Sequence, residues 1–135
     1  MANAIYPKFL EQILQGGVNL SSVNVKAVLV DLADYTYSST HEFLTSVPGA
    51  ARVATSANLG TKTFTNGTFD TADTTFTAAT GDQSEAVILY VDTGTEATSR
   101  LIVLRDTGVT GLPVTPNGGD ITVGVASGWF TLGST

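Results

Sequence analysis

The chain has 135 residues, a mass of 14.0 kDa and a formal net charge of −6, and only 13% of its residues are charged. Its 6 Lys and Arg are too few to form the dense positive surface that neutralises phosphates, so we expect no nucleic-acid partner. The absence of cysteine excludes disulfides and thiolate metal sites.

The hydrophobic fraction of 42% and the many threonines are typical of a folded, β-rich protein rather than of a disordered chain. No segment approaches the roughly 20 apolar residues that a membrane span needs, so we expect no membrane partner. Lys8 and Glu11 interrupt the apolar stretch near the start, which a secretory signal would leave unbroken. We therefore expect a protein that is made in the cytoplasm without a signal peptide.

Residues 1–18 predict one short amphipathic helix. Pro7 is compatible with a first helical turn, and Gly16-Gly17 supply a stop. The apolar face of this helix would pack on the same domain or on another subunit. The apolar residues recur at spacings of three and four, the period of a helix face: Ile5, Phe9, Leu10, Ile13 and Leu14.

Residues 19–135 predict a second unit, which is built of strands. The apolar run at 24–32 is typical of a central strand with both faces at least partly covered. The near-continuous apolar run at 84–92 predicts another such strand, with residues 99–106 as its hairpin partner.

The remaining segments predict short elements joined by turns. Residues 40–50 are ambiguous and could form a single helical turn that Pro48-Gly49 would end. Residues 52–79 predict a meander of short strands, in which Asn66-Gly67 is the dipeptide that a type I′ hairpin turn prefers. Residues 120–132 contain an alternating run and the closing segment GWFTL.

About eight short strands without helices between them predict an all-β fold. We expect an antiparallel β-sandwich of the jelly-roll kind with one short N-terminal helix. Parallel pairing would need longer crossovers than the gaps between these strands allow.

The stretch PNGGD at 116–120 could be a phosphate cradle or a turn. A phosphate cradle needs glycine-rich backbone that leads into a helix N-terminus. Here the glycines lead into Asp120 and an alternating run. The stretch therefore predicts a tight turn before a strand.

His41 is the only histidine, and the chain contains no G-x-S-x-G sequence that would mark a nucleophile elbow. One imidazole without thiolates also cannot complete a zinc site. We interpret His41, next to Glu42, as a surface or turn residue, and we expect no enzyme activity and no cofactor.

Several carboxylates occur in pairs of short spacing. None of the pairs matches an EF-hand loop, so we expect them to cap turns and to keep the surface soluble. A weak calcium site built from two loops, or a glycosidase pair, stays open at this point. The pairs are Asp70 with Asp73, Asp82 with Glu85, and Asp92 with Glu96.

Three segments resemble small virion proteins that are encoded near the capsid genes of tailed bacteriophages. They are NVKAVLVDLADYTYSSTHEFLTSVPGAARVATSANL, FDTADTTFTAATGDQSEAVILYVDTG and TGLPVTPNGGDITV. The resemblance extends over residues 1–132 and rests on overall texture rather than on a chemical signature. Some proteins of this kind are capsid decoration, or cement, proteins with a jelly-roll sandwich that bind the outside of the shell. Others are structural proteins of the head or tail.

The resemblance implies a virion location, the major capsid protein as partner, and no catalytic residues. Self-association as a dimer or trimer on a symmetry axis would suit such a role. The alternative is a tail- or fibre-associated module that binds host-surface carbohydrate. Aromatic side chains are either core residues or partner anchors. The candidate contact residues are Tyr6, Phe9, Leu10, Tyr35, Tyr37 and Trp129.

Overall fold

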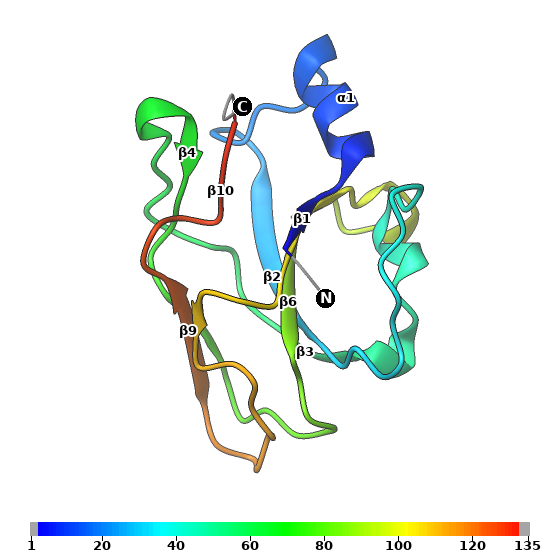
Figure 1. The fold of residues 1–135 in the computed structure, drawn as a ribbon, viewed down its shortest axis with the longest axis vertical. Coiled ribbons are helices and arrows are strands. Elements are labelled where there is room, and N and C mark those ends of the chain that lie inside the picture. Colours follow the sequence, from blue (N-terminus) through cyan, green and yellow to red (C-terminus); the bar gives the residue numbers. More distant parts are fainter. Residues whose placement is uncertain (1–2, 133–135) are drawn as a thin grey trace.

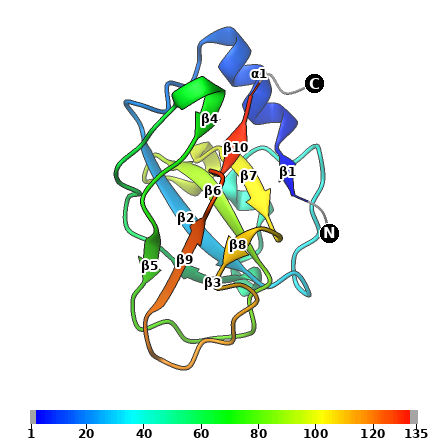
Figure 2. The same cartoon turned by 60° about the vertical axis from the view of Figure 1, so that its left-hand side comes forward.

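The computed structural model describes residues 3–132 and shows an all-β fold with one α-helix (Figure 1 and Figure 2). All strand pairings among these residues are antiparallel, as predicted. The strands are β1 (Ala4–Ile5), β2 (Asn24–Val30), β3 (Arg52–Thr55), β4 (Thr68–Phe69), β5 (Thr74–Phe76), β6 (Ala86–Asp92), β7 (Leu101–Arg105), β8 (Val109–Thr110), β9 (Ile121–Val125) and β10 (Phe130–Thr131). The helical elements are α1 (Pro7–Gln15) and the short 3-10 turns η1 (Leu44–Ser46), η2 (Gly49–Ala51), η3 (Thr65–Gly67) and η4 (Glu96–Thr98).

The main sheet has five strands in the order β1-β7-β6-β2-β3. The smaller sheets β5-β9-β8 and β10-β4 lie to one side of it, and the segment 32–51 lies on the other side (Figure 1). β2 and β6 pair along their whole length, and nearly all their side chains are buried because both faces of the sheet are covered. The two apolar runs are therefore central strands, and β7 is the hairpin partner of β6, as predicted. This arrangement is consistent with a β-sandwich, whereas the jelly-roll topology is not confirmed and stays a prediction.

The helix α1 forms where the periodicity predicts it and ends at Gly16, whose φ of 74° lies in the left-handed region that glycine favours. Ile5, however, is not part of the helix but pairs with Val103 in the main sheet. Tyr6 precedes Pro7, and a proline disfavours helical backbone angles for the residue before it. The helix can therefore begin only at Pro7.

The two predicted turns have the expected backbone. Asn66 and Gly67 both have positive φ, 54° and 79°, as the dipeptide predicts. In PNGGD, the glycines lead into β9 and not into a helix, and Gly118 has a φ of 91°. The carboxylate of Asp120 accepts the backbone N–H of Ala78 at 2.9 Å, so it ties this turn to the loop that follows β5. Residues 40–50 contain η1 and the start of η2.

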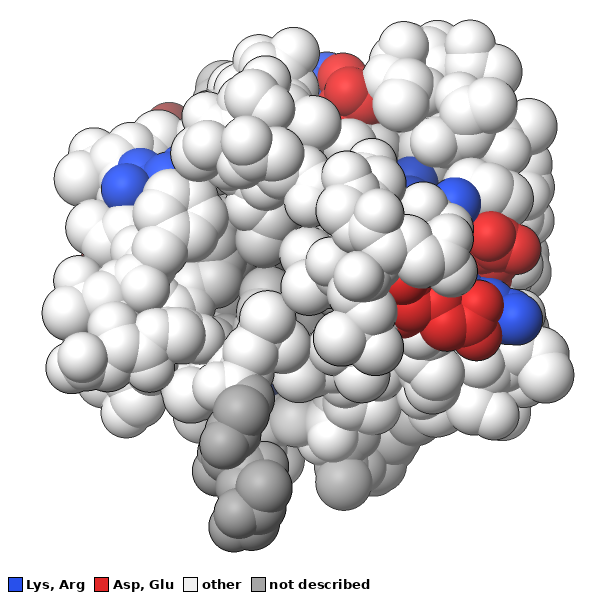
Figure 3. All heavy atoms as spheres, turned by 90° about the horizontal axis from the view of Figure 1, so that it is seen from above, with Lys and Arg blue, Asp and Glu red and all other residues white. Residues whose placement is uncertain are grey.

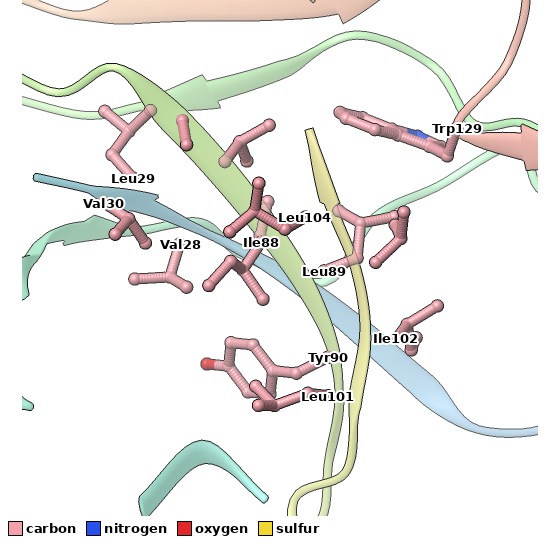
Figure 4. Packing of buried hydrophobic residues seen from close by; sticks show 14 of the residues in the cluster. Val28, Leu29, Val30, Ile88, Leu89, Tyr90, Leu101, Ile102, Leu104 and Trp129 are labelled. Carbon is pink, nitrogen blue, oxygen red and sulfur yellow. The ribbon is translucent and has the colours of Figure 1, made fainter. Parts of the chain in front are cut away.

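The core lies on both sides of the main sheet. Figure 4 shows Trp129 on one side of it, and Tyr90 and Leu101 together on the other. Tyr6 and Phe9, from the N-terminal segment, are fully buried in the same core. Within residues 3–132, no helix has the length and apolar content of a membrane-spanning segment.

Candidate functional site

Most of the side chains that were candidates for partner contacts lie in the core. The exposed fractions are 0% for Tyr6 and Phe9, 3% for Tyr35 and 1% for Trp129, whereas Leu10 and Tyr37 are half-buried. A partner could not reach the four buried side chains without opening the fold. The sequence left a core role open for the rings, and the burial of these four agrees with that role.

Specific contacts hold these rings in place. The indole Nε1 of Trp129 donates a hydrogen bond to the hydroxyl of Thr71 at 2.9 Å. Phe9 packs edge-on against Phe130, with ring centroids 5.8 Å apart. Phe130 in turn packs against Phe69 at 5.6 Å, so the helix and the small strands share one aromatic cluster.

Tyr6, Tyr35 and His41 form a hydrogen-bonded chain. The hydroxyl oxygens of the two tyrosines are 2.8 Å apart, and the Tyr35 hydroxyl is 2.8 Å from His41 Nδ1. Burial raises the pKa of Tyr6, and its hydrogen bond to Tyr35 adds to that effect. Burial lowers the pKa of His41. His41 is thus not a surface partner of Glu42, which instead pairs with Arg100 at 2.8 Å. His41 is a turn residue, as the alternative interpretation has it, because its backbone N–H donates to the carbonyl of Ser38 at 3.1 Å.

An apolar groove lies at the end of the molecule where α1 and the η3 turn meet. It has a volume of about 500 Å³, and the residues that line it, all within 3–132, include no Asp, Glu, Lys or Arg. Phe64 is 43% exposed at the groove, and Leu14, in the last turn of α1, is 87% exposed. Its apolar lining consists mainly of Ile13, Val18, Leu20, Phe64, Phe69 and Phe130.

Lys62 fixes one wall of this apolar groove. Its ammonium group donates to the backbone carbonyl of Leu20 at 2.9 Å and also to that of Val23. The loop that carries Val18 and Leu20 is therefore tied to the segment before Phe64, and the groove is held open by local structure. Figure 3 views this end of the molecule, where most of the charged side chains lie toward one side and only a few charged groups appear on the rest of the face.

A second depression, here called the polar cleft, lies beside β2, β3 and the C-terminal end of β6. It has a volume of about 190 Å³ and is lined by side chains from these strands, from η1 and from the 93–99 loop. Two ion pairs border it: Lys26 with Asp92 at 3.2 Å, and Arg52 with Glu96 at 3.0 Å. The structure thus brings Asp92 and Glu96, one of the predicted carboxylate pairs, to the same cleft.

Tyr90 forms part of the wall of the polar cleft. Burial raises the pKa of Tyr90, the nearby charge of Asp92 raises it further, and Arg52 opposes the shift. The carboxyl group of Glu96 has a lowered pKa because Arg52 donates a hydrogen bond to it. At neutral pH the cleft therefore contains a protonated phenol between charged groups of both signs.

Several other carboxylates cap backbone groups, as predicted. Glu85 accepts the N–H of Leu32 at 2.8 Å, and Asp70 accepts the N–H of Thr71 at 2.8 Å. In the described part of the chain, one group of three carboxylates has oxygens within 4.8 Å of one another: Asp31, Asp34 and Asp82. Asp31 in this group accepts the N–H of Ala33 at 2.9 Å.

No protein-family model matches the chain, and a search of curated proteins finds no significant match.

Little in the sequence predicts the two depressions. The pairs Phe9-Leu10 and Ile13-Leu14 make the apolar face of the helix too broad for one narrow buried stripe, and this excess is the only signal for exposed apolar surface near the groove. The polar cleft joins segments that are more than 60 residues apart, such as those around Lys26 and Asp92, so no local pattern reveals it.

Proposed function

We propose that this protein is a structural component of a tailed-bacteriophage virion and that it binds the outer surface of the capsid as a decoration protein. The resemblance of its sequence segments supports the virion role. The observation that carries the binding role is the uncharged apolar groove, whose lining residue Phe64 is 43% exposed, together with the exposed Leu14, which follows the lining residue Ile13 in α1. Exposed apolar surface of this kind is typical of protein–protein contact.

The groove suits a lattice partner for a physical reason. If a binding site exists only in the assembled shell, a protein that binds it stabilises the shell, because binding lowers the free energy of the assembled state alone. Many identical copies then act together through their high local concentration. A modest apolar contact through Leu14 and Phe64 is therefore sufficient, and no catalytic group is needed.

The test is rebinding of the purified protein to heads of the parent phage that have been expanded and stripped of it. We expect rebinding at micromolar protein and a higher temperature of head disruption. Leu14→Ser should weaken rebinding, whereas Gln83→Ala, an exposed change away from the groove, should not. Absence of rebinding by the unaltered protein at micromolar concentration would contradict the proposal.

A second candidate function is a tail- or fibre-associated module that binds host-surface carbohydrate. The polar cleft favours it, because charged groups of both signs and hydroxyl groups converge there. This function predicts binding to glycans in the absence of any capsid, which separates it from the decoration role.

A further inference from the structure

We propose that the polar cleft binds a single ring of a neutral saccharide. The inference deepens the second candidate function, on which it rests, by naming the ligand class. It stands apart from capsid binding, because the cleft lies between β2, β3, β6 and the 93–99 loop, away from the apolar groove. Three features carry it: an unpartnered hydroxyl on a nearly buried side chain, a balanced set of charges, and a small apolar wall.

The unpartnered hydroxyl belongs to Tyr90. This side chain is only 5% exposed, it lines the cleft, and its hydroxyl has no hydrogen-bond partner among residues 3–132. In Figure 4 its oxygen is directed away from the β6 and β7 ribbons, on the side of the sheet opposite Trp129. The oxygen is not fully buried, so solvent in the cleft reaches it, and a ligand atom that accepts a hydrogen bond can replace that solvent. Because burial raises its pKa, the phenol keeps its proton at neutral pH and can donate.

The charges at the cleft sum to zero. Lys26 neutralises Asp92, and Arg52 neutralises Glu96. An anionic ligand would meet the two carboxylates that line the cleft and a cationic one would meet the guanidinium of Arg52, so a neutral ligand fits best. The carboxylates can accept hydrogen bonds from ligand hydroxyls, and such charge-assisted bonds are the stronger kind.

Donors are also free at the cleft. The guanidinium of Arg52 uses Nε to donate to Val47 and Nη2 to donate to Leu44 and Glu96, while Nη1 has no partner in the described part of the chain. Thr95 contributes a hydroxyl that likewise makes no hydrogen bond within residues 3–132. A ligand with both donors and acceptors on neighbouring atoms, such as a sugar with adjacent hydroxyl groups, matches this mixture.

The wall and the size complete the match. The side chains of Val28 and Leu44 line the cleft beside these polar groups, so a ligand needs one apolar face. A pyranose ring offers such a face through its C–H groups. The volume of about 190 Å³ is below the range of roughly 300–1,000 Å³ that drug-sized ligands occupy, which suits one ring rather than an extended oligomer.

The test is a titration of the full ¹⁵N-labelled protein with methyl glycosides of glucose, galactose and mannose and with N-acetylglucosamine. We expect at least one of them to shift the amide signals of Gly94 and Thr95, with a dissociation constant on the order of millimolar. No capsid is present, so a failure of capsid binding and a failure of this inference are separate results. No shift from any of these sugars at about 50 mM would overturn the inference, since that concentration would nearly saturate a millimolar site.

Variants locate the binding. Tyr90→Phe removes only the hydroxyl and should weaken binding about tenfold, whereas Tyr37→Phe, outside the cleft, should leave it unchanged. Thr95→Val, at an exposed position, is a second variant that leaves the fold intact and should also weaken binding. Sugar binding that survives both cleft changes, or binding confined to an anionic sugar such as N-acetylneuraminic acid, would overturn the inference.

Discussion

The hydroxyl oxygens of Tyr6 and Tyr35 lie 2.8 Å apart inside the protein, and they connect the residue before α1 to the segment that covers the main sheet. The Tyr35 hydroxyl is also 2.8 Å from His41 Nδ1. One arrangement gives both hydroxyl protons an acceptor: Tyr6 donates to Tyr35, Tyr35 donates to Nδ1, and the imidazole is neutral with its proton on Nε2. The chain of hydrogen bonds therefore has a direction.

Tyr35→Phe should destabilise the protein by about 2 kcal/mol, because it removes two hydrogen bonds and leaves the buried Tyr6 hydroxyl without its partner. Urea denaturation measures the loss in free energy of unfolding. Tyr37→Phe is the matched control, since the Tyr37 side chain is half-buried and makes no hydrogen bond within residues 3–132. Equal losses from the two changes would show that the hydroxyl chain does not stabilise the fold.

Stability should also fall when His41 takes up a proton. Burial lowers its pKa in the folded protein, so the unfolded chain binds this proton at higher pH than the folded chain does. The stabilising contribution is therefore complete above the ordinary histidine pKa of about 6.5 and is lost as the pH falls through the lower folded value. A protonated Nδ1 would also donate to Tyr35 and reverse the chain, which leaves Tyr6 without an acceptor.

The measurement is the free energy of unfolding at closely spaced pH values between about 5 and 7.5, a window above the ordinary range of carboxylate titration. His41→Gln should flatten the dependence in this window. A variant that keeps the full pH dependence would assign the effect to other groups.

The long strands could be predicted because their signal is local. The runs around Val28 and Ile88 are apolar on both faces, and such strands lie in the middle of a covered sheet. The helix was equally clear from its spacing and its stop at Gly16. The two-residue strands were harder: β1 was absorbed into the helix prediction, because Ile5 fits the helical spacing and only the pairing with Val103 reveals the strand.

The burial of the aromatic side chains could not be predicted, because it depends on contacts distant in sequence. Trp129 is hydrogen-bonded to Thr71, and Tyr6 is hydrogen-bonded to Tyr35. No periodicity in the sequence connects the two residues of either pair. A ring at a strand end has the same sequence signature whether it faces the core or solvent. The two depressions could not be predicted for the same reason. Each is lined by loops that are brought together only when the core packs.

Gly16 and Gly49 should respond differently to replacement by alanine. An added Cβ meets nothing within 4 Å at either position, so only backbone conformation distinguishes them. Gly16 has a φ of 74°, and Gly16→Ala should destabilise the protein by about 1 kcal/mol because alanine is strained there. Gly49 lies outside the left-handed region, and Gly49→Ala should be neutral or stabilise by about 0.5 kcal/mol. Thermal unfolding of the two variants compares them, and a similar loss in both would mean that Gly16 does not adopt this cap.

Leu14 and Leu29 test whether exposure decides the effect of losing an apolar side chain. Leu29 is fully buried in β2, and Leu29→Ala should cost about 3 kcal/mol through lost burial and the cavity it leaves. Leu14 is 87% exposed, and Leu14→Ser should change the free energy of unfolding by no more than about 0.5 kcal/mol, mainly through helix propensity. Denaturation curves measure both values. A loss above about 1.5 kcal/mol for Leu14→Ser would mean that Leu14 is buried in solution, for example against a second copy, because exposed changes rarely cost so much. A dependence of that loss on protein concentration would identify such a contact directly.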